Sequence, residues 1–335
     1  MIYIISILRV LCVLCGLILI FFWRGNFLLV KGFGINADAG WLDGDLALLE
    51  KELAYYAGTG FTHVEIPVHG VGAVCNGVLL RERVRELCRL LACFPLKYTV
   101  HSPNPLNLMN LDDWETERRL LISSIEFARL IGAEILVCHS GRYRPEEDFG
   151  LPRQPMSLRV EEKMWHAEVA ALQEMSRLAA EAGVLLGMEN ARPYLDGSPY
   201  CYAERPEELV KLIRAVDRQN VGITLDLGHA YLASRFYGFD FLRAVRAAAP
   251  HVRHLHVHDN FGKVIASYEK KQPELVAKGR GDLHLPPGWG EVPLRDVFRL
   301  LDNYEGVLTM ELRPRYRQHT GEALAALRDL CAAEL

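Results

Sequence analysis

The feature that most constrains the fold of this chain is a regular alternation of strand-length apolar runs with segments of helical periodicity. Eight such runs occur within residues 27–334, and apolar residues at helical spacing follow each of them. We expect the strands to end near Ile35, Glu65, His101, His139, Glu189, Asp226, His256 and Glu311. We expect helices over about 46–56, 80–91, 112–131, 160–182, 209–216 and 239–249, from about 293, and over 324–330. Eight strand–helix units predict an α/β fold, a single-domain closed (β/α)8 TIM barrel.

A doubly wound open sheet is the alternative fold, and the sequence does not favour it. The first turn, GINADAG at residues 34–40, lacks the glycine pattern of a dinucleotide-binding loop. No linker rich in Pro, Gly or Ser divides the body. Composition excludes a disordered chain or a small disulfide-stapled domain, because 50% of the residues are hydrophobic and 24% are charged. The net charge of −4 gives no global basic field for nucleic acid.

Residues 1–25 form a separate apolar N-terminal segment. Residues 1–23 carry a single charge, at Arg9, and Arg24 follows. A helix of this length could just span a bilayer, and no signal-peptide cleavage pattern follows it. One interpretation is a membrane anchor. The other is a misassigned start, with the protein beginning at Leu29 or Val30.

The cysteines bear on the compartment. There are eight, without paired zinc-ribbon spacing, and Cys12 and Cys15 lie inside the apolar segment. We interpret all eight as reduced thiols of a cytosol-facing protein. The expected localisation is therefore cytoplasmic, or membrane-anchored through residues 1–23 if the apolar segment is an anchor.

Polar side chains gather at the ends of the expected strands, which is the most informative functional signal. In a barrel, the carboxyl ends of all strands meet at one mouth. So many carboxylates and imidazoles in one cavity would repel each other or stay unpaired without a cation between them. Imidazole with carboxylate is a ligand mixture suited to Zn²⁺, Mn²⁺ or Co²⁺. We therefore expect a divalent metal site formed from Glu65, His101, His139, Glu189, Asp226, His229, His256, Asp282, His284 and Glu311.

The other histidines lack this strand-end position. We expect surface or packing roles for His63, His69, His166, His251, His254 and His319. His258 is ambiguous, because it shares the strand face of His256 but lies at the edge of a loop. Asp259 and Asn260 are expected to shape the turn that follows.

Seven short motifs, in this order and with a strand before each, resemble the xylose isomerase-like TIM barrel superfamily. This superfamily includes the sugar-phosphate isomerase/epimerase group, ketose 3-epimerases and the endonuclease IV family. The resemblance covers about residues 30–330. Its motifs are VHSP at 100–103, VCHSG at 137–141, MEN at 188–190, LDLGHA at 225–230, HLHVHDN at 254–260, DLHLPPGWGEV at 282–292 and MELR at 310–313.

The isomerase and epimerase branch implies one divalent ion: Mn²⁺, Co²⁺, Zn²⁺ or Mg²⁺. Carried over by position, its ligands are Glu189, Asp226, His256 and Glu311. The resemblance also implies that Glu189 and Glu311 act as an acid/base pair on opposite faces of a sugar, sugar-phosphate or polyol ketone, through a metal-stabilised enediolate. His229 would bind the substrate near its carbonyl group.

The endonuclease IV branch implies three zinc ions and phosphodiester hydrolysis instead. His101, His139 and Glu189 would hold the first ion. Glu189, Asp226, His256 and Glu311 would hold the second. His229, Asp282 and His284 would hold the third, so the chain can fill every position. However, the segment from HVHDN to HLPPGWGEV resembles the isomerase branch better, and no clearly basic loops for gripping a duplex are found.

The preferred hypothesis is therefore a metal-dependent isomerase or epimerase with a small carbohydrate substrate. Nucleic acid is a partner only in the hydrolase alternative, and a membrane only if residues 1–23 are an anchor. A non-catalytic sugar-binding barrel is less favoured, and the sequence leaves a homo-oligomer open. We expect substrate contacts from Glu65, His101, Arg192 and Trp289, while Arg142, Trp41 and Tyr194 are weaker candidates.

Overall fold

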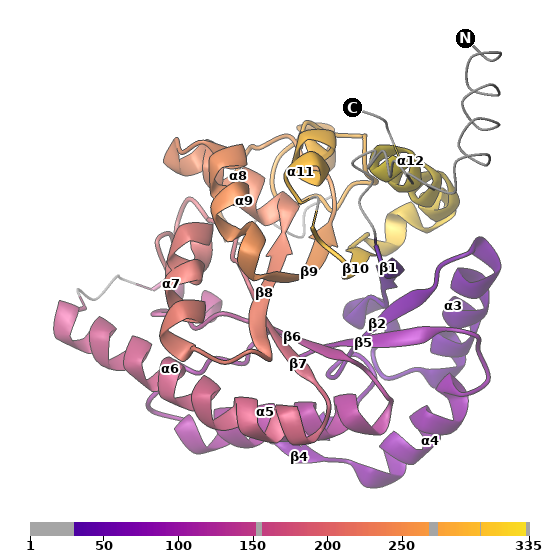
Figure 1. Ribbon diagram of the computed structural model, residues 1–335, viewed down its shortest axis with the longest axis horizontal. Coiled ribbons are helices and arrows are strands. Elements are labelled where there is room, and N and C mark those ends of the chain that lie inside the picture. Colours follow the sequence, from indigo (N-terminus) through magenta and orange to yellow (C-terminus); the bar gives the residue numbers. More distant parts are fainter. Residues whose placement is uncertain (1–29, 152–155, 268–273, 302, 333–335) are drawn as a thin grey trace, which may run out of the picture.

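Eight parallel strands form a closed barrel in the computed structural model, which describes residues 30–151, 156–267, 274–301 and 303–332. The strands follow one another around the barrel in the order β1-β10-β9-β8-β7-β6-β5-β2 (Figure 1). This arrangement confirms the predicted α/β barrel. The strands are β1 (Gly32–Asn36), β2 (His63–Pro67), β5 (Lys97–His101), β6 (Ile135–His139), β7 (Leu185–Glu189), β8 (Val221–Asp226), β9 (Val252–Val257) and β10 (Val307–Met310).

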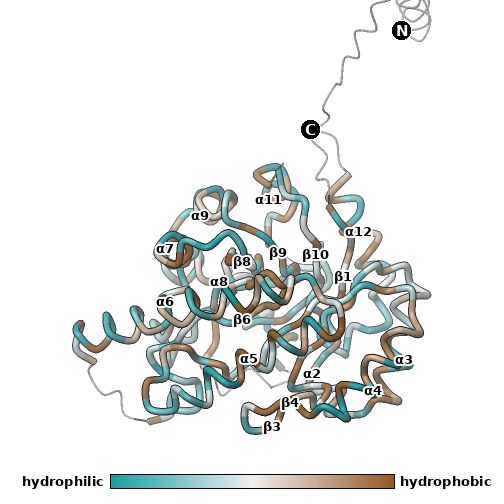
Figure 2. The backbone as a smooth tube through the Cα atoms, turned by 60° about the horizontal axis from the view of Figure 1, so that its bottom comes forward, coloured by the Kyte–Doolittle hydropathy of each residue, from teal (hydrophilic) through white to brown (hydrophobic). Residues whose placement is uncertain are grey.

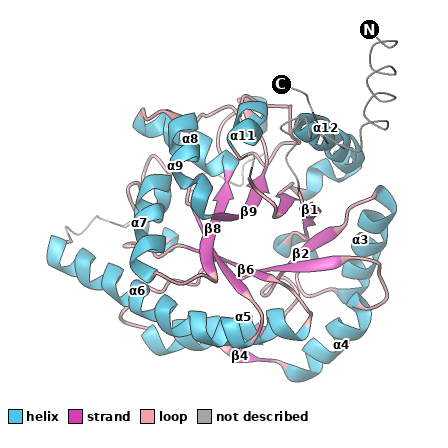
Figure 3. Ribbon diagram, in the orientation of Figure 1, coloured by secondary structure: helices cyan, strands magenta, loops and turns pink. Residues whose placement is uncertain are grey.

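Helices surround the strands on the outside of the barrel (Figure 3). Hydrophobic and hydrophilic residues alternate along many of these helices (Figure 2). In α7 (Pro206–Val216), for example, the buried residues Leu209, Leu212, Ile213 and Val216 form an apolar stripe. The outer helices that the sequence predicts are α3 (Leu46–Thr59), α4 (Arg81–Leu91), α5 (Trp114–Leu130), α6 (Leu158–Glu181), α7 (Pro206–Val216), α9 (Phe241–Ala248), α11 (Leu294–Leu300) and α12 (Thr320–Ala332).

Several short elements were not predicted. They are α2 (Ala39–Leu42), the hairpin of β3 (Val74–Cys75) and β4 (Val78–Leu79), α8 (Leu227–Tyr237), α10 (Glu274–Ala277), and the 3-10 helices η1 (Glu146–Asp148), η2 (Tyr202–Glu204), η3 (Ala249–His251) and η5 (Pro314–His319). Most of them lie in loops too short to show a clear periodicity.

The chain changes from strand to helix at Asp226, where the sixth strand is expected to end. β8 ends at this residue, and α8, which the sequence did not predict, begins at once. The Asp226 carboxylate causes this change, because its Oδ1 accepts a hydrogen bond from the backbone N–H of His229 at 2.6 Å and caps the helix. Conversely, Asp113 occupies the cap position of α5, but its side chain makes no capping hydrogen bond.

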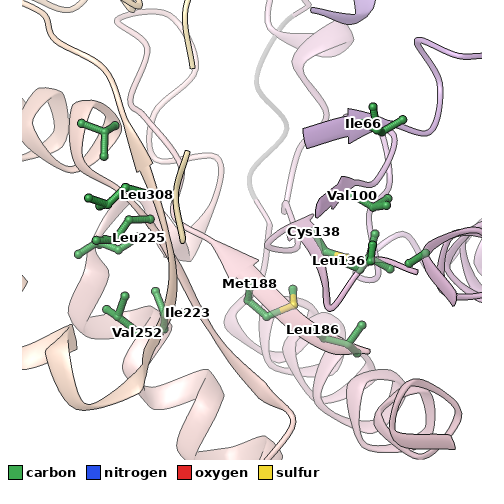
Figure 4. Close-up of a cluster of buried hydrophobic side chains, with 14 of the residues drawn as sticks. Ile66, Val100, Leu136, Cys138, Leu186, Met188, Ile223, Leu225, Val252 and Leu308 are labelled. Atoms are coloured by element: carbon green, nitrogen blue, oxygen red, sulfur yellow. The ribbon is translucent and has the colours of Figure 1, made fainter. Parts of the chain in front are cut away.

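The outward faces of the strands form the main hydrophobic core. Leu186 and Met188 of β7 and Ile223 and Leu225 of β8 are fully buried between the barrel and the helices (Figure 4). Residues on the other strands extend the same layer, including Ile66, Val100, Leu136, Cys138, Val252 and Leu308. This layer buries most of the apolar surface that stabilises the fold.

The inward faces of the same strands carry many small and polar residues beside aliphatic ones such as Ile135 and Val307. Thr99, Thr224 and Thr309 are at most 2% exposed. Glycines make room for larger neighbours, since a Cβ atom at Gly187 would lie 2.3 Å from Thr224 Oγ1, and one at Gly32 would lie 2.5 Å from the Nδ1 of His63. Barrel interiors are usually filled by layers of branched apolar residues. Here the interior instead leaves space for ionisable side chains.

Two expectations about the ends of the chain and the thiols remain. The expected membrane anchor or misassigned start in residues 1–25, like the start of the first strand at residue 27, lies outside the described residues. Among the residues that the structure describes, no helix is long and apolar enough to cross a membrane. The six cysteines within this part of the chain are all free thiols.

Candidate metal centre

Four side chains meet at the carboxyl ends of neighbouring strands and form what we call the core group. Glu189 ends β7, Asp226 ends β8, His256 lies in β9, and Glu311 directly follows β10. One potential ligand atom from each lies within 4.8 Å of the others. The Nδ1 atom of His256 is 3.1 Å from Glu189 Oε1 and 3.3 Å from Glu311 Oε1.

The core group fits a divalent cation. Three carboxylates and one imidazole are hard and intermediate donors that suit Mn²⁺, Co²⁺, Zn²⁺ or Mg²⁺. Glu189, Asp226 and His256 are at most 2% exposed, and Asp226 Oδ2 is buried without a hydrogen-bond partner. A buried, unpartnered carboxylate oxygen is costly unless a cation compensates it. The buried carboxylates and imidazoles are thus consistent with a bound divalent ion.

A second group shares Glu189 with the core group. His101 ends β5 and His139 ends β6, and their Nε2 atoms lie 3.3 Å and 3.1 Å from Glu189 Oε2. The two rings meet edge to face, with centroids 5.1 Å apart. The two oxygens of Glu189 therefore face different sets of partners, Oε1 toward the core group and Oε2 toward this histidine pair.

A third group lies on the other side of the core group. It comprises His229, Asp282 and His284, as the sequence motifs suggested, together with His258. Asp282 Oδ2 lies 3.4 Å from His229 Nε2 and 2.9 Å from His284 Nε2. His284 has a φ angle of 47°, a left-handed conformation that is uncommon for a residue other than glycine.

His258 was ambiguous in the sequence, and the structure assigns it to this third group. Its ring stacks on His284 with centroids 4.0 Å apart, and its Nε2 lies 3.1 Å from Asp226 Oδ1. The alternation of His254, His256 and His258 was the signal that could have identified it, because alternate residues share a face and His258 directly follows β9.

A fourth group lies deeper in the barrel, below the core group. Glu65 of β2 contacts His254 and His256 of β9. His254 was expected to have a surface or packing role, but it is 1% exposed and its Nε2 lies 3.3 Å from Glu65 Oε2. The sequence reasoning missed this contact because it considered only strand ends. The small inward residues of the barrel make room for it.

The two core glutamates differ in their electrostatic surroundings. Burial opposes ionisation of Glu189, but the imidazoles of His256, His139 and His101 outweigh it and hold its pKa well below the usual range. Burial raises the pKa of Glu311 to about 7, with Glu189 and Asp226 adding to the effect while His256 opposes it. Burial also opposes the charged form of His256, but the surrounding carboxylates raise its pKa well above the usual value.

A cavity of about 640 Å³ opens above these groups at the barrel mouth. Its lining includes Glu65, His101, His139, Arg142, Glu189, Arg192, His229, Asp282, His284, Glu311 and Arg313. Arg192 Nε lies 3.1 Å from Asp282 Oδ2, and an Nη atom of Arg142 lies 2.6 Å from His139 Nδ1. His69, expected at the surface or in packing, also lines this cavity.

The three aromatic candidates for substrate contact, Trp289, Trp41 and Tyr194, do not line the mouth cavity. Trp289 packs against Tyr316 and His319 and does not line the mouth cavity. Trp41 borders a separate small pocket, and Tyr194 packs in an aromatic cluster with Phe149 and Tyr200. Among the sequence-predicted substrate contacts, the structure therefore brings Glu65, His101 and Arg192 to the mouth, but not Trp289.

A larger cavity of about 1120 Å³ opens at the opposite end of the barrel, near the amino ends of the strands. Its lining includes Lys31, His63, Lys97 and Arg253. It contains none of the strand-end carboxylates, so we do not place the chemistry there. The smaller cavity at the mouth is the better candidate because the ligand groups converge on it.

Comparisons with known proteins agree with this architecture. Residues 53–330 match the family model described as xylose isomerase-like TIM barrel. An uncharacterized protein from Methanocaldococcus jannaschii is 26% identical over 247 residues, which cover 71% of this chain and 72% of that protein.

Two solved structures share the fold. The D-psicose 3-epimerase of Clostridium cellulolyticum H10, solved with D-tagatose, superimposes with a TM-score of 0.64 at 15% identity over 90% of this chain and all of that one. The IolI protein, solved with a bound zinc atom, has a TM-score of 0.61 at 18% identity and covers 89% of this chain and 96% of that one.

Proposed function

This chain belongs to the xylose isomerase-like TIM barrel family, and on that premise we propose that it is a divalent-metal-dependent isomerase or epimerase. The substrate class is a sugar, a sugar phosphate or a related polyol ketone. The observation that carries the proposal is the pair Glu189 and Glu311, which approach the same nitrogen of His256 beneath the mouth cavity at 3.1 Å and 3.3 Å. Asp226 completes the donor set.

The residues that would hold the ion are Glu189, Asp226, His256 and Glu311. When bound there, a divalent ion supplies Lewis-acid polarisation of the substrate carbonyl, which acidifies the neighbouring C–H bond. The buried position of the site excludes bulk water and strengthens these electrostatic effects. The surrounding carboxylates also limit the net positive charge that the ion would introduce.

Glu189 and Glu311 move the proton. One carboxylate removes the proton next to the carbonyl, which gives an enediolate, and the other returns a proton. Return to the opposite face of the same carbon gives an epimer, and return to the neighbouring carbon gives an isomer. His229 lies beside this pair and beside Arg192, whose Nη atom is 3.2 Å from His229 Nε2. These two residues orient the oxygen atoms of the substrate.

The solved relatives support this proposal at the level of fold. One of them is a sugar 3-epimerase and another carries zinc, and both cover nearly the whole barrel. The carboxylate–imidazole chemistry of the core group in this chain agrees with such an activity independently of that similarity.

The test is metal content followed by an assay on a panel of ketoses. The full chain is purified without chelator, and bound metal is measured by elemental analysis. One Mn²⁺, Co²⁺ or Zn²⁺ per chain, with conversion of at least one ketose to an epimer or isomer, supports the proposal. An Asp226→Asn chain is the matched control, because it keeps the fold but weakens the donor set. Absence of bound metal after reconstitution would contradict the proposal.

A second candidate function rests on the extra ligand groups. The histidine pair with Glu189, and the group of His229, His258, Asp282 and His284, could each hold a further ion. Three zinc ions would suit an endonuclease IV-like phosphodiester hydrolase, in which metal ions supply a hydroxide and neutralise the leaving oxygen.

The same elemental analysis separates the two candidates. About three zinc ions per chain, together with cleavage of a duplex that carries an abasic site, would favour the hydrolase. A single ion and an inert duplex would favour the isomerase or epimerase.

A further inference from the structure

We propose that Glu65 is a positioning residue that fixes the orientation and proton placement of His256 from inside the barrel. The two nitrogens of the His256 ring face opposite carboxylates. Nδ1 faces Glu189 and Glu311 in the core group, whereas Nε2 lies 3.0 Å from Glu65 Oε1. The inference rests on the proposed function, in which the core group is the metal site, and it adds Glu65 as a residue that acts on this site through His256.

The position of Glu65 is set by neighbouring strands and not by solvent. Its register partner on β5 is Thr99, whose hydroxyl donates a hydrogen bond to Glu65 Oε2 at 3.0 Å. His254, two residues before His256 on β9, approaches the same oxygen at 3.3 Å. Glu65 is 1% exposed, and its recorded ion pairs within the described residues are with these two histidines.

The chemistry of a neutral imidazole determines which nitrogen of His256 carries the proton in this arrangement. A histidine that binds a metal through Nδ1 carries its proton on Nε2, and a carboxylate behind that nitrogen accepts the proton in a hydrogen bond. Glu65 therefore favours the tautomer with a free Nδ1 lone pair. It also makes the imidazole a stronger donor and holds the plane of the ring.

A second ion between Glu65, His254 and His256 is the competing explanation. Glu65 Oε1 and the two histidine Nε2 atoms are buried without an aligned hydrogen-bond partner. However, an ion there would require His256 to bind metals through both nitrogens, and thus to lose both ring protons. His256 Nε2 and Glu65 Oε1 are 3.0 Å apart, so a rotation of the ring or the carboxylate that aligns the N–H would complete a hydrogen bond without a second ion, which favours the positioning role.

The test compares Glu65→Gln and Glu65→Leu with wild type, using Co²⁺ as the probe. Co²⁺ is titrated into the metal-free full chain, and both the dissociation constant and the visible absorption spectrum are recorded. We expect Co²⁺ binding to weaken about tenfold in Glu65→Gln, which keeps an acceptor oxygen, and about a hundredfold in Glu65→Leu. The absorption bands should shift in both variants, because the ligand field of His256 changes.

Glu204→Gln is the matched control, because Glu204 is also buried at 1% exposure. It accepts backbone hydrogen bonds from Tyr200 and Cys201 and a hydroxyl hydrogen bond from Tyr237, and these contacts do not involve the core group. The Glu204→Gln substitution should leave the Co²⁺ affinity and the absorption spectrum unchanged. Thr99→Val, which removes only the hydroxyl contact to Glu65, should weaken Co²⁺ binding in the same direction but less than Glu65→Gln.

The outcomes separate this inference from the proposed function. If the Glu65 variants bind Co²⁺ with wild-type affinity and spectrum, the positioning role is wrong while the metal site stands. If elemental analysis shows that Glu65→Gln loses one whole ion that wild type holds, Glu65 is itself a ligand and the positioning role is again wrong. If wild type binds no Co²⁺, the proposed function fails first and the inference with it.

Discussion

The outward and inward faces of the same barrel strands have opposite chemistry. On β7, Leu186 and Met188 point outward into the apolar layer, whereas Gly187 and Glu189 point inward. On β8, Ile223 and Leu225 are part of the same outer layer, while Thr224 and Asp226 share the inner face. Successive side chains of a strand point to opposite sides, so one short sequence contributes to both regions.

Along one strand, alternate residues therefore contribute either to the apolar layer that stabilises the fold or to the polar candidate site. The outer layer removes apolar area from water and stabilises the fold. The inner face is polar, and burying carboxylates there costs free energy unless partners or a cation compensate. Substitutions at neighbouring residues of one strand should therefore have separable effects, and the predictions below test that separation.

The largest expected effect is on the inner face, where Glu189→Gln and Glu311→Gln should each abolish measurable turnover. Loss of a general acid or base costs about 10²- to 10⁴-fold in rate, and each glutamate is also a proposed ligand. The measurement is kcat for the ketose identified in the panel, at saturating metal. The thermal unfolding midpoint should remain close to that of wild type. Wild-type turnover in either variant would refute the acid/base assignment.

The opposite result is expected three residues away on the outer face of the same strand. Leu186→Ala should lower the free energy of unfolding by about 2–5 kcal/mol, because it leaves a cavity in a fully buried layer. Chemical denaturation measures the change. The Co²⁺ affinity of the folded variant should stay within about twofold of wild type, because the substituted side chain does not contact the core group. A large loss of metal affinity would show that the two faces are not separable.

One carboxylate outside the barrel interior should make stability depend on pH. Glu168 of α6 is fully buried, and burial raises its pKa to about 7, although hydrogen bonds from the Gly141 N–H and the Tyr202 hydroxyl oppose the shift. Folding therefore favours the protonated form. The stabilising contribution is complete below pH 4.5 and is lost as the pH rises through about 7.

The size of this effect follows from the shift in pKa, at about 3 kcal/mol between the two limits. Denaturation at several pH values should show a loss that is about 3 kcal/mol larger in wild type than in Glu168→Gln, which stays neutral at position 168, because Glu311, whose pKa burial also raises to about 7, contributes equally to both. Glu204→Gln serves as the control for removal of a buried carboxylate. Parallel pH profiles for wild type and Glu168→Gln would contradict the assignment.

The smallest expected effect tests the space that the inner glycines provide. Gly187→Ala places a Cβ atom 2.3 Å from Thr224 Oγ1 and should destabilise the fold by about 1–3 kcal/mol. Thr224→Ala removes the clashing oxygen, so the double variant should regain most of that loss. A double-mutant cycle by chemical denaturation measures this coupling. Additive effects would show that the inner face has more room than the structure indicates.

Much of the architecture was predictable because the strand and helix periods are clear. Each inner strand ends within a residue or two of the polar group that marked it, as at His139 and Glu189. The helix α8 was missed because its first residues continue an apolar strand pattern, and only the cap at Asp226 stops the strand. Capping depends on side-chain geometry that an apolar pattern does not contain.

The candidate site was predictable in its residues more than in its pairings. Strand ends identified Glu189, Asp226 and Glu311, since the barrel brings all carboxyl ends together. His254 was missed because its partner, Glu65, lies on a strand far away in sequence. Trp289 does not line the mouth cavity, because it packs on Tyr316 and His319, a placement that a loop sequence does not reveal.

The division of Glu189 between two groups has a thermodynamic consequence. Its Oε1 faces His256 and its Oε2 faces His101 and His139, so one negative charge serves two possible ion positions. Occupancy of either position changes the affinity of the other by the same factor, since linkage between two binding events is reciprocal. Any loading of both positions would therefore be coupled through this single carboxylate.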